Sequence, residues 1–148
     1  MTVLDAGLEL SDAQSIVIAS SSSTLTTVVS TNIIDLGTGQ LDGWDDAKSP
    51  ELGDSMWNVN VNVALVGAGG IMTASLVTKA ADASISSGGT TKASIVIPAT
   101  TVAGTKFAIR LPTGFEVLRY TGVIYSGAAA ISASKIDSWI GLDNEVPG

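Results

Sequence analysis

Alternation of apolar and polar side chains is the dominant pattern along this chain. From Trp57 to Leu65 every second residue is apolar, and Asn58, Asn60 and Asn62 occupy three of the intervening positions. Successive side chains of a β-strand point to opposite faces, so this run predicts a strand with one buried and one solvated face. Asparagine is depleted in ordinary strands, and we therefore expect the polar face to be hydrated or hydrogen-bonded to a partner.

Eight further segments have the composition of short strands. They are rich in β-branched and aromatic side chains, and Gly, Pro and Ser residues separate them. We expect these strands at residues 15–18, 24–29, 31–36, 71–78, 93–97, 106–111, 116–125 and 130–140. Many short strands at this spacing predict an all-β protein, an antiparallel β-sandwich of the jelly-roll type.

Helix signals are weak. Ser11 and Gln14 have the spacing of a capping box, but the β-branched run 16–18 follows, so at most one helical turn is predicted. Residues 20–31 are almost all Ser, Thr and Val, which fits either a flat edge strand or a mobile arm. Residues 41–55 have the composition of a long irregular connection.

The length of 148 residues predicts one β-sandwich domain over 1–148, with an N-terminal arm over residues 1–14 as an open alternative. Asp5 and Glu9 stand where a signal peptide would have basic residues, and no apolar run approaches the roughly 20 residues that span a bilayer. We therefore expect synthesis in the cytoplasm and no membrane partner. Charged residues make up only 14% of the chain, which favours a protein packed permanently against neighbours over a merely soluble, hydroxyl-rich domain.

The absence of His and Cys removes the commonest general base, the thiol nucleophile and the commonest zinc ligands. We expect no enzyme activity, no catalytic residue, no metal and no cofactor. Residues 1–60 contain nine acids and only Lys48 as a base, and without a basic stripe nucleic acid is not an expected partner. Asp42, Asp45 and Asp46 could offer oxygen ligands to calcium, although a solvated acidic loop is the favoured interpretation.

Candidate interface residues are one loop tryptophan, its acidic neighbours and two arginines. They are Trp44, Asp45, Asp46, Arg110 and Arg119. Trp44 either packs into its own domain, the favoured interpretation, or anchors a partner, because tryptophan is enriched at binding hot spots. The arginines, with Lys106, either meet the acidic half of a neighbouring copy or are scattered solubilising charges. Trp57 and Trp139 are predicted to be core residues.

A series of short motifs adds a resemblance to this picture. The motifs are Ser11-Asp12-Ala13-Gln14, the run 30–37 (STNIIDLG), Ile97-Pro98, Arg110-Leu111-Pro112, Leu118-Arg119-Tyr120 and Ile140-Gly141-Leu142-Asp143. Their order resembles the small jelly-roll cement proteins, also called decoration proteins, of tailed bacteriophage heads, a family typified by the cementing protein of a Bordetella podovirus. The segment 20–29 is longer than in the family pattern.

The resemblance implies a homo-dimer or homo-trimer on the outer capsid surface of the virion. There the protein would bridge major capsid protein subunits and stabilise the shell against the pressure of packaged DNA. A carbohydrate- or receptor-binding module of a virion is the alternative from another class, because the same sandwich hosts lectins and viral adhesins.

Overall fold

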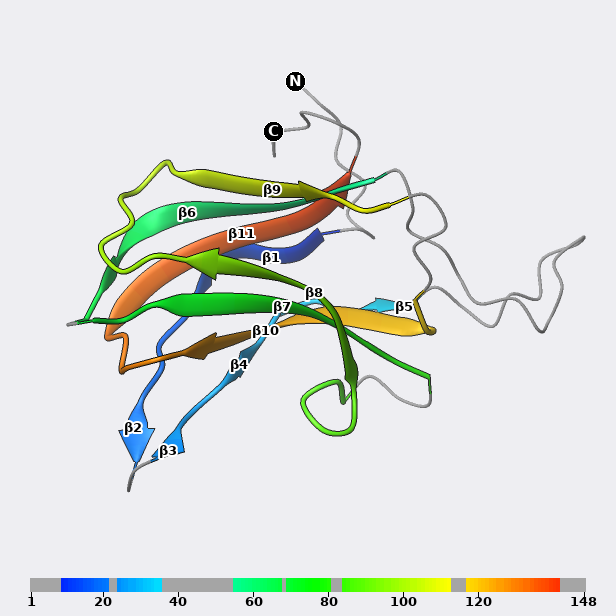
Figure 1. The fold of residues 1–148 in the computed structure, drawn as a ribbon, viewed down its shortest axis with the longest axis horizontal. Helices are drawn as coiled ribbons and strands as arrows, with labels where there is room; N and C mark the ends of the chain where they lie inside the picture. Colours follow the sequence, from blue (N-terminus) through cyan, green and yellow to red (C-terminus); the bar gives the residue numbers. More distant parts are fainter. Residues whose placement is uncertain are drawn as a thin grey trace, which may run out of the picture.

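The computed structural model describes residues 9–21, 24–35, 55–67, 69–80, 84–112 and 117–141. These residues form two antiparallel β-sheets packed face to face and contain no helix (Figure 1). The all-β sandwich predicted from the sequence is therefore confirmed.

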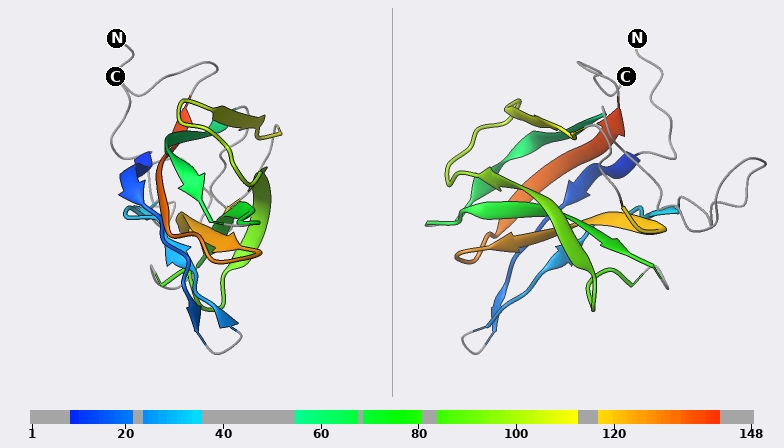
Figure 2. Two further views of the ribbon diagram at one scale, coloured as in Figure 1. Left: turned by 90° about the vertical axis from the view of Figure 1, so that its left-hand side faces the viewer. Right: turned by 45° about the vertical axis from the view of Figure 1, so that its right-hand side comes forward.

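The first sheet contains, in spatial order, β1 (Glu9–Ser15), β11 (Ala133–Gly141), β6 (Met56–Val66) and β9 (Lys106–Arg110). The second contains β4 (Val28–Val29), β10 (Tyr120–Gly127), β7 (Met72–Lys79) and β8 (Thr90–Ile97), and β5 (Ile34–Asp35) also pairs with β10. A separate two-stranded ribbon of β2 (Ser20–Ser21) and β3 (Thr24–Leu25) projects from the body of the sandwich (Figures 1 and 2).

The order of the described strands is that of a jelly roll. When β4 and β5 are counted as one interrupted strand and the ribbon is set aside, eight strands remain. Numbered along the chain, they follow the order 1-8-3-6 in one sheet and 2-7-4-5 in the other. A double sheet of eight strands arranged as two Greek keys is the jelly-roll architecture.

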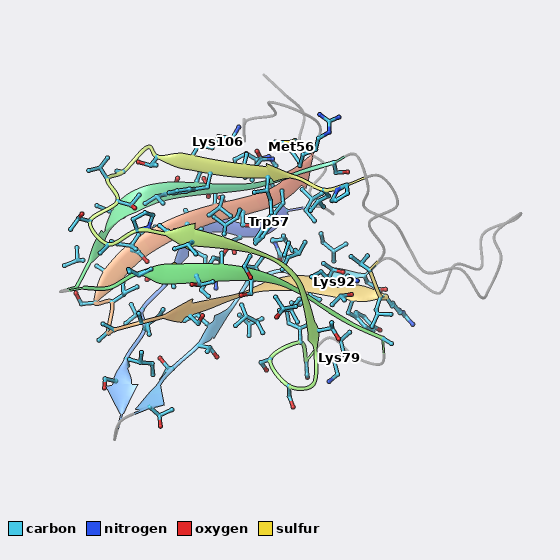
Figure 3. All side chains as sticks on the ribbon, in the orientation of Figure 1. Met56, Trp57, Lys79, Lys92 and Lys106 are labelled. Carbon is cyan, nitrogen blue, oxygen red and sulfur yellow. The ribbon has the colours of Figure 1, made fainter. Side chains whose placement is uncertain are left out.

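Strand β6 follows the alternation of its sequence. Trp57, Val59 and Val61 are fully buried between the sheets, where they pack with residues of β7, β10 and β11. Figure 3 shows the Trp57 side chain between the two layers. The predicted strand 57–65 is therefore confirmed and is one residue longer at each end, although the Val63 side chain is 41% exposed.

The N-terminal strand differs from the sequence prediction. No helical turn forms at 11–14, where at most one was predicted, and the strand expected at 15–18 is wrong: β1 covers Glu9–Ser15 and pairs with β11. Of residues 16–18 only Ile18 forms an isolated bridge, to Ile131. The strand is bulged on both sides of Ser11, and Ala13 has a φ of 42°. The Ala13 N–H donates to Asp137 Oδ1 of β11 at 2.6 Å, so a distant partner overrides the local capping signal.

Gln14 joins this strand to the second sheet. Its Oε1 accepts hydrogen bonds from Ser11 Oγ (2.7 Å) and Thr31 N–H (2.9 Å), and its Nε2 donates to the Val29 carbonyl (2.8 Å). The Asn32 N–H also donates to the Leu10 carbonyl, at 2.9 Å. The two sheets are therefore connected along the side of the sandwich formed by β1 and residues 29–32.

Other strand boundaries shift by a few residues. The segment 24–29 is divided between the ribbon and β4, 31–36 is reduced to β5, and β8 begins three residues before the predicted 93–97. Strands β7 and β9 lie close to prediction, whereas β10 and β11 begin later than expected. The described residues of 20–31 do not form one flat edge strand, because they are divided among β2, β3 and β4, and the base of the ribbon is closed by Thr26 N–H donating to the Ala19 carbonyl at 2.9 Å. The mobile arm stays a prediction.

Of the residues considered for an N-terminal arm, 9–14 lie in β1, and 1–8 are outside the described residues. The predicted irregular connection and its acids, residues 41–54, are also outside them. No helix that could cross a membrane occurs in the part of the chain that the structure describes.

Candidate functional site

Arg119 is bound within its own chain. Its guanidinium makes a two-pronged contact with the Asp35 carboxylate, with Nε donating to Oδ1 at 2.8 Å and Nη2 to Oδ2 at 3.0 Å. This hydrogen bonding to Asp35 raises the pKa of Arg119, and the guanidinium also lies 4.8 Å from the centre of the Tyr120 ring. Arg119 therefore fastens β5 to β10 and contacts an acid from the acidic half of its own chain.

Arg110 ends β9 and is exposed, opposite Met56 in the register of β6. It belongs to the first sheet, whereas Arg119 precedes β10 of the second sheet. Both arginines lie at the end of the sandwich where β9 ends and β10 begins. Trp44, Asp45 and Asp46 are outside the described residues, so the structure does not place them.

The outer face of the first sheet carries a polar row around Trp139. Trp139 is buried, as predicted, but it lies opposite Asn58 on the face turned away from the main core cluster. Lys106 Nζ sits 5.6 Å from the centre of its ring. Among the described residues, Trp139 Nε1 and Asn58 Oδ1 are buried without a hydrogen-bond partner.

The neighbouring asparagines bond to each other. Asn60 Nδ2 donates to Asn62 Oδ1 at 2.6 Å, and both side chains are half-buried. The polar face of β6 is therefore satisfied partly by its own side chains. The predicted hydration or partner contact of this face stays a prediction.

Three carboxylates approach one another at β1 and β11. Partial burial, followed by the charges of Asp12 and Asp137, raises the pKa of Glu9. No group of three or more acidic side chains within the described ranges has an arrangement that could hold a metal ion. The Asp137 carboxylate is instead used as an acceptor for the Ala13 N–H.

One end of the sandwich carries apolar side chains in solvent. It consists of the connections 16–19, 67–71, 98–105 and 128–132 with the adjoining strand ends, and we call it the apolar end. Six of the seven large hydrophobic side chains that are exposed in the described residues belong to it, and only Leu118 does not. The six are Val17 (46% exposed), Val63 (41%), Val66 (53%), Ile71 (42%), Val96 (58%) and Val102 (66%).

Contacts between the connections hold this end together. Ile18 bridges Ile131, the Ser132 N–H donates to the Val66 carbonyl at 2.8 Å, and the Ala128 N–H donates to the Ile71 carbonyl at 3.0 Å. The Leu65 N–H reaches the Thr101 carbonyl at 3.3 Å. Sequence reasoning missed this surface, because its residues come from five separate segments and each looks like an ordinary strand residue.

Comparison with known proteins gives the chain its family. The family model described as Bbp16 matches residues 10–140, which is most of the chain. The chain belongs to the Bbp16 family. Bbp16 is a Bordetella phage protein family, so the phage relationship expected from the motifs is confirmed. A search of curated proteins returned no significant match to the chain.

Proposed function

We propose that this Bbp16-family protein is a capsid cement protein that binds the outer surface of a phage head. The observation that carries the proposal is membership of a phage protein family over most of the chain. The jelly-roll sandwich and a sequence with only 14% charged residues support a structural role. Such a role needs no catalytic residue and no cofactor, and we propose that the protein is not an enzyme.

The proposed mechanism is stabilisation by mass action. A protein that binds only the assembled shell adds its binding free energy to that assembly, about 2.7 kcal/mol per site at a concentration 100 times Kd. A homo-dimer or homo-trimer that bridges neighbouring major capsid protein subunits gains further, because the second contact forms at a high effective concentration. Membranes and nucleic acid have no part in this mechanism.

The test is co-sedimentation of the purified protein with phage heads that lack it. We expect saturation at hundreds of copies per head and survival of the decorated heads at higher temperature. Heads already carrying the protein serve as the control, since their sites are occupied. Binding of only a handful of copies would contradict the cement role and favour the receptor- or carbohydrate-binding module, which a glycan screen with wild type and Trp44→Ala would then examine.

A further inference from the structure

The charges of the described residues are distributed unevenly along the sandwich. The four connections of the apolar end contain no charged residue, and neither does the whole stretch from Ala13 to Ile34, which includes the ribbon. Asp35, Arg110 and Arg119 lie toward the opposite end, and so do Lys79 and Lys92, which Figure 3 labels away from the β6–β7 and β8–β9 connections. Two lysines adjoin the apolar end: Lys106, which follows the 98–105 connection at the start of β9, and Lys135, which lies opposite Val63 in the register of β6 and β11.

Single exposed apolar residues are normal on soluble proteins, but a gathering of them is a mark of an interaction surface. Here the gathering coincides with connections that contain no charged residue, and the adjoining charges are Lys106 and Lys135 on the strands. The connections themselves are inexpensive to desolvate, because they hold no ionised group that must be removed from water. The uncharged ribbon projects from the body beside the β10–β11 connection (Figures 1 and 2).

We infer that the apolar end is the surface by which the protein docks on the shell, and that its occupant is a weakly charged, apolar patch of the shell protein. This inference rests on the proposed cement function. Charge complementarity favours this occupant: an uncharged surface fits an uncharged one, and docking through it leaves Asp35, Arg110 and Arg119, toward the opposite end, outside the contact. Contacts made this way are driven by apolar burial and respond little to salt.

This assignment differs from an interface built on Trp44, Asp45, Asp46, Arg110 and Arg119. Binding through the aspartates and arginines of that set would weaken as ionic strength rises, because salt screens exposed ion pairs. Binding through the apolar end would change less than about threefold between 0.05 and 0.5 M NaCl. The salt dependence of binding to heads therefore shows which of the two surfaces is used, without any substitution.

The deciding experiment compares acidic substitutions at the two ends of the sandwich, measured as binding to heads that lack the protein. Val66→Asp and Val102→Asp place a charge in the apolar end, at side chains that are 53% and 66% exposed. Ser86→Asp adds the same charge at an exposed position of the β7–β8 connection, at the opposite end. We expect each valine variant to lose at least tenfold in affinity, and Ser86→Asp to stay within about twofold of wild type.

Two accompanying measurements keep the result interpretable. Melting curves show whether each variant is folded. Val66→Thr and Val102→Thr give a milder, nearly isosteric change, for which we expect an intermediate loss of affinity for the heads. Sedimentation equilibrium of all variants records whether any of them changes its own oligomeric state.

Full binding by the folded valine variants, an equal loss with Ser86→Asp, or a tenfold weakening of wild type by salt would each overturn the docking assignment while leaving the cement function intact. Loss of binding together with dissociation of a wild-type oligomer would assign the apolar end to a second copy and also overturn it. Failure of the wild-type protein to bind heads would remove the cement function, and the docking assignment with it.

Discussion

Tyr125 connects the two sheets inside the core. Its hydroxyl lies 2.9 Å from Ser11 Oγ of β1 and also bonds to the Ser138 side chain of β11, which accepts the Trp57 indole N–H at 3.0 Å. The side chain is fully buried, so these bonds replace the water that the hydroxyl would otherwise bind. Removing the hydroxyl leaves two buried serines with fewer partners.

We predict that Tyr125→Phe lowers the free energy of unfolding by about 1–2 kcal/mol. Urea denaturation at neutral pH measures the change. Tyr120→Phe is the matched control: Tyr120 is only half-buried, and its ring contact with Arg119 persists in phenylalanine. Equal losses in the two variants would show that the hydrogen bonds of Tyr125 contribute nothing specific.

The same hydroxyl predicts a pH dependence. Burial raises the pKa of Tyr125 from 10.0 to about 12. Above pH 10 the unfolded chain therefore loses this proton first, so stability is fully present below pH 10 and falls as pH rises to about 12, by up to roughly 3 kcal/mol. Urea melts at pH 9 and pH 11.5 should show a larger loss for wild type than for Tyr125→Phe; parallel losses would assign the effect to other groups.

Gly67, at the start of the β6–β7 connection, lies against the backbone of the β10–β11 connection. A Cβ atom on Gly67 would lie 2.4 Å from the Ala130 carbonyl oxygen and 3.2 Å from Ile131 Cα, so two turns of the apolar end pass backbone against backbone. Neither backbone can move away as a flexible side chain could. Glycine is required here by close approach.

We predict that Gly67→Ala costs about 1–3 kcal/mol of stability, as overpacking typically does. Gly69→Ala, in the same turn, is the control: its Cβ would meet nothing within 4 Å, and only its φ of 72° opposes alanine. Thermal unfolding should give Gly67→Ala a lower melting temperature than Gly69→Ala. The reverse order would mean that the β6–β7 and β10–β11 connections move apart easily enough to accommodate the added Cβ atom.

The ribbon is predicted to contribute to stability through Leu25, which packs against the core cluster. The base of the ribbon is closed by the Ala19–Thr26 pair, with Thr26 Oγ1 also accepting the Ala19 N–H at 2.9 Å. Replacing residues 20–25 with Asn-Gly would join this pair by a two-residue hairpin turn. Because loop closure depends only weakly on length, we assign the expected loss of about 1–3 kcal/mol to the removal of Leu25. A change below about 1 kcal/mol in a urea melt would show that the contact of Leu25 with the core contributes little.

How well each element follows from the sequence depends on where its partners lie. Strand β6 was predictable because its alternation is local and both faces are specified by its own residues. Strand β1 was not, because the partners of Ala13 and Gln14 lie at Asp137, Val29 and Thr31. Trp139 was correctly expected to be buried, but the face it occupies depends on strand register, which alternation alone does not reveal.

At the scale of the whole molecule, the two sides of the sandwich differ. Gln14 connects the sheets on the β1–β4 side, whereas no backbone hydrogen bond joins β8 to β9 among the described residues. We predict that Gln14→Leu lowers stability by about 1–3 kcal/mol and speeds exchange of the Thr31 amide. Ser15→Ala, at an exposed neighbour, should change stability by less than about 0.5 kcal/mol.

Unchanged amide exchange at Thr31 in Gln14→Leu would contradict the connecting role of this side chain.

The apolar end, like strand β1, depends on residues that are far apart in the sequence. The sequence specified the net charge and the uncharged stretches, but six exposed residues from separate segments become one surface only when the strand order is known.

The ribbon also has a practical consequence. Because it begins and ends at the paired residues Ala19 and Thr26, its length can change without moving β1 or β4. A foreign peptide inserted between Ser21 and Thr24 would thus be carried away from the core on a preformed stem. If the protein coats heads in hundreds of copies, this position would turn each head into a dense, regular array for antigen display.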